Sequence, residues 1–427
     1  MAFANYTIEL ASEDGIFPSN WINITSYVKS LEITRGRDDV LSQVQTGTCS
    51  IQLKNDDGSF SPAYTLSPLY PNVSLMRAIR ITGSPSSVTS YNFSQIATLT
   101  FTQVGNQVTA GANKLFFGYI QAIIPNPDPS VKETTIELSD GFAWLDLAKV
   151  TPTFVSGKMY DHVTAILNAA GWPTIARTID AGALTFTPSY NEQSALQQLQ
   201  SVVVDHEGGL LYMDGAGNIV AQDQNARFTG SYLSNVTTIT DTDSVISLTA
   251  ERPLRDIYNE IQITCLAGQI LQTDATSVAK YGPRRLSLNA NFLSGNDAEQ
   301  WAKWLLSIKK DSKERLIVGF MANSSADLVY QALARELSDR IYFREFNAKT
   351  GTGGNVTTPV NGVGEYNIEA IRHTISNGGK LHLFEWQLSP VITTTRSQQT
   401  SSLGGWWTLD ASQLTSGTYV TRLSYTV

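Results

Sequence analysis

Short stretches of alternating apolar and polar residues, interrupted by turn sequences, run through residues 21–81 and constrain the fold more than any other feature. Leu31 and Ile33 alternate with polar residues, and the alternation resumes over residues 49–53 after the sequence Arg35-Gly-Arg-Asp-Asp39. A period of two places successive side chains on opposite faces of a β-strand. The pattern therefore predicts two strands, each with one solvated face, joined as a hairpin by a turn at residues 35–39.

A second turn sequence, Asn55-Asp-Asp-Gly-Ser-Phe-Ser-Pro62, leads to the corner Pro68-Leu-Tyr-Pro71. Its residues tolerate positive φ angles or hydrogen-bond to their own backbone. The portion from Asn55 to Gly58 is similar to the start of a calcium-binding loop. However, Leu66 occupies the position at which an EF-hand carries its bidentate glutamate. We interpret the segment as a pinned loop and not as a calcium site.

The remainder of residues 1–150 also has the pattern of strands, with further β signals at Leu99–Val104, Leu115–Ile120 and Thr135–Ser139. The unpaired edges of a sheet invite aggregation, and closing the sheet into a barrel removes them. A barrel is therefore an arrangement that would suit this region.

Helical periodicity appears in the middle of the chain. Apolar residues between Tyr160 and Ala170 recur at intervals of three and four, Gly171 stands at the usual C-cap position, and Pro173 blocks continuation. Two further helices are predicted from their apolar faces, at Ser194–Glu207 and at Asp297–Ile308. These helices indicate α/β segments between the strand-rich regions.

Two more hairpins are predicted, one from Leu210 to Ala221 and one from Tyr366 to Leu388. Residues 327–343 are ambiguous, because Ala332–Leu337 could continue a helix whereas Ile341–Phe343 favour a strand. The segment Gly351–Gly364 is rich in Gly, Thr, Asn and Val and is expected to be a mobile loop.

Three groups of residues carry a family resemblance. In the first region they are Trp21, Tyr27-Val28, Thr34–Arg37, Gly47, Leu53, Asn55, Asp57-Gly58, Phe60–Pro62 and Tyr70-Pro71. In the second they are the helix from Tyr160, its ending Ala169–Pro173 and the hairpin entry Glu207–Gly209. The third group is Asn259, Tyr281–Arg284 and the helix from Asp297.

These residues resemble the baseplate hub family of phage tails, a group of minor tail proteins. The resemblance implies an α+β, predominantly β fold: two tail-tube-like β-barrel domains with inserted α/β subdomains and a C-terminal β extension. We place the first barrel at residues 1–150 and an α/β insertion with two helices and a hairpin at 151–235. The second barrel region, with helix 297–309, occupies 236–392, and a linker and C-terminal extension occupy 393–427. Hubs of this family usually form a trimer whose two barrels per subunit mimic sixfold symmetry.

The charge of the chain argues against a general nucleic-acid binder. Charged residues are only 16% of the 427 residues, against about a quarter in ordinary domains, and the formal net charge is −8. Binding to phosphates needs a basic stripe, and no Lys/Arg cluster provides one. In a ring-shaped hub we expect acidic or neutral polar side chains to line the lumen, so that DNA passes without specific binding.

Targeting signals and disulfides are not expected. The N-terminal residues lack a basic region followed by an apolar run, and no apolar segment approaches the length of a membrane span. Cys49 and Cys265 lie far apart in strand-like contexts, so two buried free thiols are favoured over a disulfide. This cysteine use fits synthesis in the host cytoplasm.

Asp205-His206-Glu207 is the strongest candidate for proton transfer or metal binding. Successive residues on a helix point about 100° apart, so these three side chains cannot converge on one ion or substrate. We interpret them as a polar helix end before Gly208. Asp38 and Asp39 are adjacent, and such residues seldom face each other across a sugar, so loop charges or an intersubunit salt bridge are favoured over glycoside hydrolysis.

The four histidines, His162, His206, His373 and His382, show no metal-binding spacing, and two cysteines cannot build a zinc site. Neither a nucleophile elbow nor a phosphate-binding loop occurs in the sequence. We therefore expect no catalytic, cofactor-binding or metal-binding residues, and no cofactor.

Residues 393–402 form a polar linker, followed by Trp406-Trp407 and an alternating strand from Tyr419 to Val427. This tail is too short to bury its own aromatic side chains. It either folds back on its own domain or adds a strand to a neighbour, and we favour the neighbour. The residues after 392 are also too few for the peptidoglycan-cleaving domain that some related hubs carry.

The function expected from these observations is that of a non-enzymatic virion protein, the baseplate hub at the tail tip, which adapts a sixfold tube to a threefold tip. Its expected partners are copies of itself, a tube or distal tail protein, and a tip, fibre or tape-measure protein. Two alternatives remain. One is a carbohydrate-binding receptor module that stacks sugars on Trp406 and Trp407, and the other is a cell-wall hydrolase whose site lacks a recognisable motif.

Overall fold

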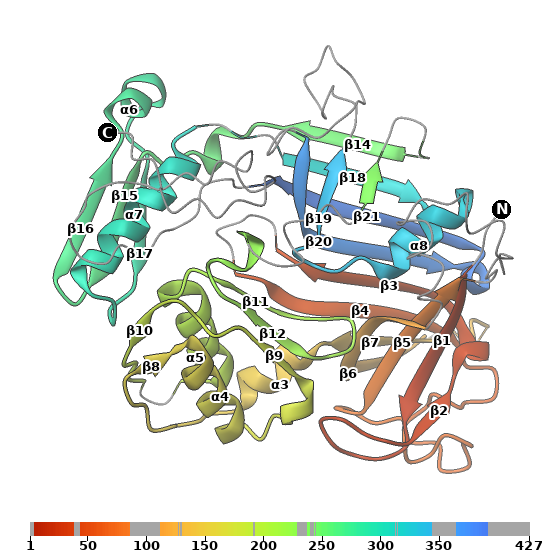
Figure 1. Ribbon diagram of the computed structural model, residues 1–427. Helices are drawn as coiled ribbons and strands as arrows, with labels where there is room; N and C mark the ends of the chain where they lie inside the picture. Colours follow the sequence, from red (N-terminus) through yellow and green to blue (C-terminus); the bar gives the residue numbers. More distant parts are fainter. Residues whose placement is uncertain are drawn as a thin grey trace, which may run out of the picture.

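The computed structural model describes residues 4–37, 43–85, 112–126, 128, 130–190, 193–228, 237–239, 243, 245–311, 313, 315–343 and 364–391. Within these residues the largest element is one sheet of 13 strands, and most of the helices lie to one side of it with the smaller sheets (Figure 1). The predicted fold class, α+β and predominantly β, is confirmed. Several predicted features lie outside the described residues: Asp38 and Asp39, the strand Leu99–Val104, most of the loop Gly351–Gly364, and residues 393–427.

The first half of the large sheet is built by the N-terminal region. Its strands are β1 (Ala4–Ala11), β2 (Trp21–Asn23), β3 (Val28–Gly36), β4 (Gln45–Lys54), β5 (Ala78–Pro85), β6 (Asn113–Pro125) and β7 (Glu133–Ser139). They lie in the order β3-β4-β7-β6-β5-β1-β2, and every neighbouring pair is antiparallel. The predicted hairpin is confirmed, with Ile33 opposite Cys49. One boundary differs from the prediction, because β3 continues through Arg35 and Gly36, whose composition predicts a turn.

The second half of the sheet is built by the C-terminal part of the described chain. Its strands are β13 (Thr237–Ile239), β14 (Val245–Glu251), β18 (Arg315–Met321), β19 (Arg340–Phe343), β20 (Glu365–Ser376) and β21 (Leu381–Pro390). The hairpin β20–β21 is the one that the sequence predicts. The ambiguous segment 327–343 contains both predicted elements, the helix α8 (Ala326–Ala334) and the strand β19.

The two halves join directly through an antiparallel pairing of β3 with β20, which runs from Gly36 opposite Ala370 to Ser30 opposite Ser376. Each of these strands also forms a hairpin with the strand that follows it, so the two hairpins meet by their first strands. We call the β3–β20 pairing the seam. It makes the two predicted barrel regions parts of one continuous hydrogen-bonded sheet.

Between the halves, the chain forms a mixed α/β region, which we call the insertion. Its elements are α3 (Gly141–Leu147), β8 (Gly157–Lys158), α4 (Met159–Ala169), β9 (Arg177–Ile179), β10 (Thr185–Phe186), α5 (Ala195–Gln200), the π-helix η3 (Ser201–His206), β11 (Leu210–Met213) and β12 (Ile219–Gln222). The helix α3 precedes residue 151, at which we place the start of the insertion from the sequence. The predicted helix at Tyr160 is α4, and Gly171 follows it with φ +71°. The predicted helix from Ser194 is α5 continued by η3, with Ser194 as its N-cap.

A second, smaller α/β unit follows within residues 236–392. It contains β15 (Glu260–Cys265), β16 (Gly268–Thr273), β17 (Arg285–Asn289), α6 (Ala275–Tyr281) and α7 (Gly295–Lys309). These strands form a separate sheet in the order β16-β15-β17. The predicted helix 297–309 is α7, and it packs on β15 and β16 (Figure 1). We call Glu260–Lys309 the outer unit, because it stands at one end of the molecule.

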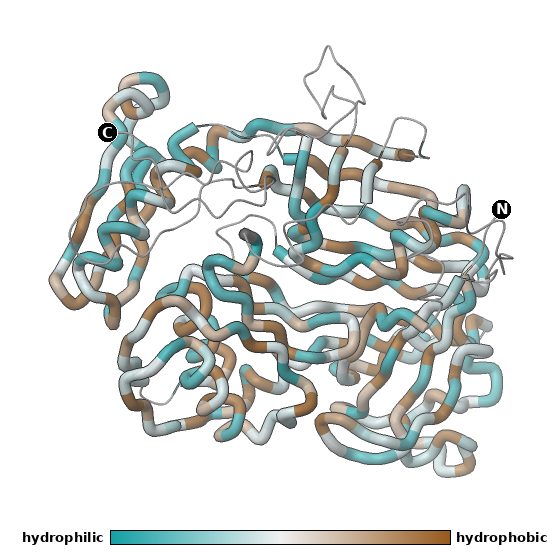
Figure 2. The backbone as a smooth tube through the Cα atoms, in the orientation of Figure 1, coloured by the Kyte–Doolittle hydropathy of each residue, from teal (hydrophilic) through white to brown (hydrophobic). Residues whose placement is uncertain are grey.

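One continuous core connects these parts. Apolar and polar residues alternate along the strands of the large sheet (Figure 2), and most of their buried apolar side chains join those of the insertion and the outer unit in one cluster. A second, small cluster on β1, β5 and β6 consists of Ala11, Ala78, Phe117 and Tyr119. Burial of this kind is the main favourable contribution to folding. Short 3-10 helices complete the fold: η1 (Thr25–Tyr27), η2 (Thr174–Ala176), η4 (Ala226–Phe228), η6 (Leu254–Asp256), η7 (Ala322–Ser324) and η8 (Asn377–Gly379).

Both cysteines are buried free thiols, as predicted. Among the helices of the described residues, none has both the length and the apolar character needed to span a membrane.

Candidate functional site at the seam of the sheet

The end of β3 approaches β20 more closely than a side chain would permit. Gly36 has φ +117°, and a Cβ atom on it would lie 2.2 Å from the carbonyl oxygen of Glu369. The next backbone N–H, that of Arg37, donates to this same oxygen at 2.9 Å. Only glycine adopts this φ without strain and leaves room for the neighbouring strand. Gly36 therefore brings Arg37 directly against β20.

A buried cluster of charges forms at this point. Glu369 Oε2 accepts from Arg37 Nε at 2.8 Å, and its Oε1 accepts from Arg227 Nη1 at 2.5 Å. Ser389 Oγ also donates to Glu369 Oε1, at 2.5 Å. Burial by itself raises the pKa of Glu369, but the guanidinium groups of Arg227 and Arg37 outweigh it and hold the pKa well below its usual range. The carboxylate is therefore charged and fully hydrogen-bonded.

The cluster connects the insertion to both halves of the sheet. Arg37 follows β3, Glu369 lies on β20, and Arg227 lies in η4 at the end of the insertion. Arg227 Nε also donates to Ser338 Oγ at 2.8 Å, and Ser338 Oγ donates to Gln222 Oε1 at 2.9 Å. Charge-assisted hydrogen bonds of this kind hold their partners in a defined geometry.

A second ion pair ties the β11–β12 hairpin to the same region. Arg35 Nη1 lies 2.7 Å from Glu336 Oε1 and 3.3 Å from the carbonyl oxygen of Met213. Glu336 Oε2 accepts from the backbone N–H of Gly215 at 3.0 Å. The hairpin turn is thus hydrogen-bonded to the segment that connects α8 to β19.

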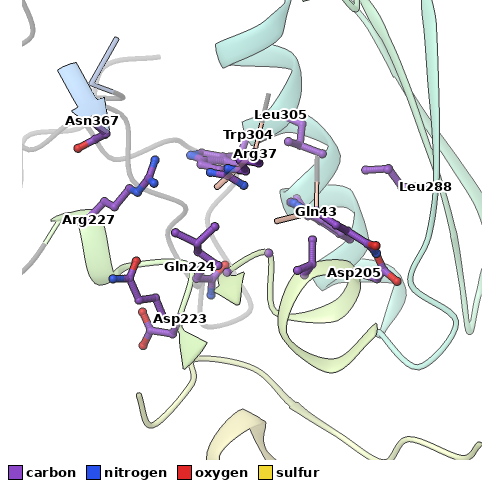
Figure 3. A pocket seen from close by; sticks show the side chains of 16 residues that line it. Arg37, Gln43, Asp205, Asp223, Gln224, Arg227, Leu288, Trp304, Leu305 and Asn367 are labelled. Atoms are coloured by element: carbon purple, nitrogen blue, oxygen red, sulfur yellow. The ribbon is translucent and has the colours of Figure 1, made fainter. Parts of the chain in front are cut away.

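A cavity of about 200 Å³ lies beside the charge cluster, where the insertion, the outer unit and the seam come together (Figure 3). Its apolar wall comes from the outer unit and from η3 and β11. Its polar wall comes from the seam and from the segment after β12. The lining residues are Arg37, Gln43, Val204, Asp205, Gly208, Gly209, Leu210, Gln222, Asp223, Gln224, Arg227, Leu288, Trp301, Trp304, Leu305 and Asn367.

The three residues of the Asp205-His206-Glu207 motif point to different places, as the sequence predicts. Asp205 faces the cavity, and burial raises its pKa to about 6. The buried carboxylate of Glu207 accepts from the backbone N–H groups of Ala183 and Leu184, at 2.7 and 3.2 Å. The helix ends at Gly208, which has φ +74°. Of the three residues, Asp205 therefore lines the cavity, whereas His206 and Glu207 are buried.

His206 lies between two aromatic rings. Its ring stacks on Phe186, with centroids 5.3 Å apart, and on Phe292, with centroids 5.0 Å apart. Its Nδ1 donates to the carbonyl oxygen of Ser201 at 2.6 Å, and its Nε2 accepts from the N–H of Phe292 at 3.3 Å. Burial lowers the pKa of His206 to about 4. This neutral ring attaches the outer unit to the insertion.

The other histidines are also structural in their contacts. His162 Nε2 donates to the carbonyl oxygens of Phe186 and Gly157, and burial lowers its pKa. His373 and His382 form a buried chain with Tyr6, with ring nitrogens 3.0 Å apart and Tyr6 Oη 2.6 Å from His382 Nδ1. Within the residues that the structure describes, no group of three or more His, Cys, Asp or Glu is placed to hold a metal ion.

The loop after β4 is pinned, as predicted. Asn55 Oδ1 accepts from the N–H of Phe60 at 2.9 Å, and Asn55 Nδ2 donates to Thr134 Oγ1 at 2.9 Å. Gly58 takes φ +73°, which the turn requires. The loop buries Phe60 but exposes four large apolar side chains, namely Tyr64, Leu66, Tyr70 and Leu75.

Neither the charge cluster nor the cavity is predicted by the sequence. Arg35 and Arg37 are part of the family resemblance, but Glu369 and Glu336 lie about 300 residues further along the chain. One signal is present: in a chain with only 16% charged residues, a glutamate inside an apolar strand such as Tyr366–Ile371 is unusual. Such a residue predicts a buried partner, but the sequence does not say which one.

Comparison with known proteins identifies the fold. No protein-family model matches the sequence, and no curated protein matches it. Several solved structures, however, match the structure of this chain. A tail protein from Neisseria meningitidis MC58 has a TM-score of 0.58 at 12% identity, over 90% of this chain and 96% of that one. The 43 kDa tail protein of prophage MuSo2 from Shewanella oneidensis has a TM-score of 0.54 at 12% identity, over the same two fractions.

These matches define the class: the chain has the fold of phage tail proteins. The resemblance that the sequence predicts is therefore confirmed for the fold.

Proposed function

We propose that this chain is a structural protein of a phage tail and, within the tail, the baseplate hub. The observation that carries the proposal is the extent of the fold match, since 90% of this chain superposes on 96% of each of two tail proteins. A match of one common module would leave much of each chain uncovered. Here the match covers nearly the whole length of both chains in each comparison.

The seam suggests how such a subunit works. Each chain contributes two sheet halves that meet through β3 and β20. Three copies in a ring would present six such halves to a sixfold tube above and a threefold tip below, and a closed ring satisfies every repeated interface. The halves must keep a fixed angle for the ring to close. The charge cluster around Glu369 would supply that rigidity.

We propose that the partners are further copies of the chain, a tube or distal tail protein on one side, and a tip, fibre or tape-measure protein on the other. The pinned loop with Tyr64, Leu66, Tyr70 and Leu75 supports an assembly role, because exposed large apolar side chains on an ordered loop are typical of interfaces. DNA would pass through the ring without specific binding, along a lumen of acidic or neutral polar side chains.

The role that we propose is non-enzymatic and located at the tail tip of the virion. Cryo-electron microscopy of the tail end of the particle tests it. The expected result is three copies that encircle the channel beneath the sixfold tube. Copies at the periphery, away from the channel, would contradict the hub proposal and favour the receptor-binding alternative. A lumen ringed by Lys or Arg would contradict the expected lining.

A further inference from the structure

The cavity beside the seam contains a buried amide without a partner. Gln224 follows β12 and is only 5% exposed. Within the described part of the chain, neither its Nε2 nor its Oε1 has a hydrogen-bond partner. Buried polar groups in native proteins are nearly always hydrogen-bonded. An amide that offers both a donor and an acceptor to a cavity indicates a place for a ligand.

Asp205 is a second polar group on the cavity wall, and it comes from a different element, η3. Its carboxyl group makes no hydrogen bond or ion pair with the residues that the structure describes, and burial raises its pKa to about 6. Figure 3 shows Gln224 and Asp205 with Leu305 of α7 around the same space. The cavity is therefore lined by polar groups from two separate segments, the buried amide of Gln224 and the partly buried carboxyl group of Asp205.

The two arginines of the cavity wall are already engaged in ion pairs or hydrogen bonds, and two acidic residues, Asp205 and Asp223, line the same cavity. Arg227 donates from Nη1 and Nη2 to Glu369 and from Nε to Ser338. Arg37 donates from Nε to the same glutamate. A phosphate or carboxylate ligand would need a cation that is available to it, so this cavity does not favour an anionic ligand. A neutral group with an N–H and a C=O suits the amide of Gln224 better.

The opposite wall of the cavity is apolar, and the cavity itself is small. Val204, Leu210, Leu288 and Leu305 lie along it, beside two tryptophans. Trp301 and Trp304 are only 4% and 7% exposed, so they do not present the open ring faces on which sugars stack. The volume of about 200 Å³ is below the roughly 300–1,000 Å³ of typical small-molecule pockets. It suits one side chain and the peptide group next to it.

We propose that this cavity binds a segment of a partner protein by inserting one apolar side chain and pairing one neutral amide of that segment with Gln224. The Nε2 group of Gln224 donates to the carbonyl oxygen of the segment, and its Oε1 accepts from an N–H. Asp205 accepts a second N–H. This anchoring site would serve the tail role proposed above. Because it is tested on the isolated chain, the anchoring site can be refuted while the tail role stands, and the tail role can be refuted while the anchoring site stands.

The probe is N-acetyl-L-leucinamide, because it has two amides and one apolar side chain. Its binding to the full chain is measured by ligand-observed saturation-transfer NMR. A fragment of this size should bind with a Kd on the order of 1 mM. Gln224→Leu keeps the size of the side chain and removes its hydrogen-bonding groups, so we expect it to weaken binding at least about fivefold. Saturation transfer to D-glucose in place of the amide would overturn the proposal in favour of a sugar site.

The matched control is Gln331→Leu. Gln331 is a buried glutamine on α8, only 1% exposed, and its Oε1 likewise lacks a partner in the described part of the chain, but it does not line the cavity. We expect this variant to bind the probe within about twofold of the wild type. Val204→Phe, which fills the cavity, should abolish binding and provides a second variant if Gln224→Leu does not fold. Equal binding by the wild type and the cavity variants, or no binding at about 20 mM probe, would overturn the proposal.

Discussion

The seam and the attachment of the outer unit join parts of this molecule by different physical means. The seam combines strand pairing from Gly36–Ala370 to Ser30–Ser376 with the buried charge cluster around Glu369. The outer unit is attached to the insertion by His206, which stacks between Phe186 and Phe292. The seam is built from strand pairing and buried charges, whereas the attachment of the outer unit is mainly aromatic stacking with one long hydrogen bond, from the N–H of Phe292 to His206 Nε2 at 3.3 Å. The cavity adjoins both junctions.

This difference indicates which part of the subunit is fixed and which part can adjust. A buried ion cluster is favourable only when every hydrogen bond is made, so it tolerates one geometry. Apolar and aromatic packing is largely non-directional and permits small shifts. We therefore expect the two sheet halves to move as one body and the outer unit to be the part that adapts to a partner.

The largest effect is expected at the seam. Glu369→Gln removes the negative charge and leaves Arg37 and Arg227 buried without it. Removing one partner of a buried ion pair costs about 3–5 kcal/mol, so the free energy of unfolding should fall by that amount in urea denaturation. A loss below about 1 kcal/mol would show that the cluster does not hold the seam.

Gly36→Ala should give the next largest effect. The new methyl group would meet the carbonyl oxygen of Glu369, and alanine is strained at φ +117°. Backbone strain and overlap together should lower the free energy of unfolding by about 2–3 kcal/mol. Gly15→Ala is the matched control, because Gly15 has φ +135° and a Cβ added to it would meet no atom within 4 Å. If both variants lose the same free energy of unfolding, the close approach of β20 does not explain why glycine is needed at position 36.

The attachment of the outer unit should be sensitive to acid. The pKa of His206 is about 4 in the folded chain and roughly 6.5 when unfolded. Protons therefore bind the unfolded chain more tightly, and the stabilisation by neutral His206 is present above pH 6.5 and is lost as the pH falls towards 4. Between pH 7 and pH 5 this loss amounts to about 2 kcal/mol.

The measurement is the difference in unfolding free energy between the wild type and His206→Phe, which keeps the stacked ring but cannot titrate. Other buried groups also titrate. Burial raises the pKa of Asp140 to about 7 and that of Asp339 to about 6, which acts in the opposite direction, and lowers the pKa of His382 to about 3, which acts in the same direction. These contributions cancel when the two proteins are compared at each pH. A difference that does not change between pH 7 and pH 5 would exclude His206 as an acid-sensitive contact.

The sequence predicts the parts of the fold that local chemistry determines. The hairpin β3–β4 and the helix α4 follow from periodicity and from turn residues such as Gly171. The predicted end of β3 is wrong, because Arg35-Gly36 has the composition of a turn but is held extended by its pairing with β20. That pairing joins residues more than 300 positions apart, which no local pattern encodes.

The cavity is beyond prediction for a related reason. Asp205 draws attention as part of a catalytic motif, but its relevant neighbours, Gln224 and Leu305, come from two other segments. Gln224 has no sequence signal at all, since glutamine is abundant in this chain and its lack of a hydrogen-bond partner appears only once the insertion and the outer unit are packed together.

The smallest effect is expected on the surface of the outer unit, where Glu260 on β15 pairs with Arg285 on β17. Their charged atoms are 3.0 Å apart, but the side chain of Arg285 is 48% exposed. An exposed pair contributes about 0.2–1 kcal/mol, so Glu260→Gln should change the free energy of unfolding by no more than that. The substitution is chemically the same as Glu369→Gln, and both carboxylates pair with arginine across neighbouring segments. Urea denaturation could instead show that the two variants lose the same free energy of unfolding. In that case burial does not make the ion pairs of the seam stronger than those of the outer unit, and the seam is not the more rigid of the two junctions.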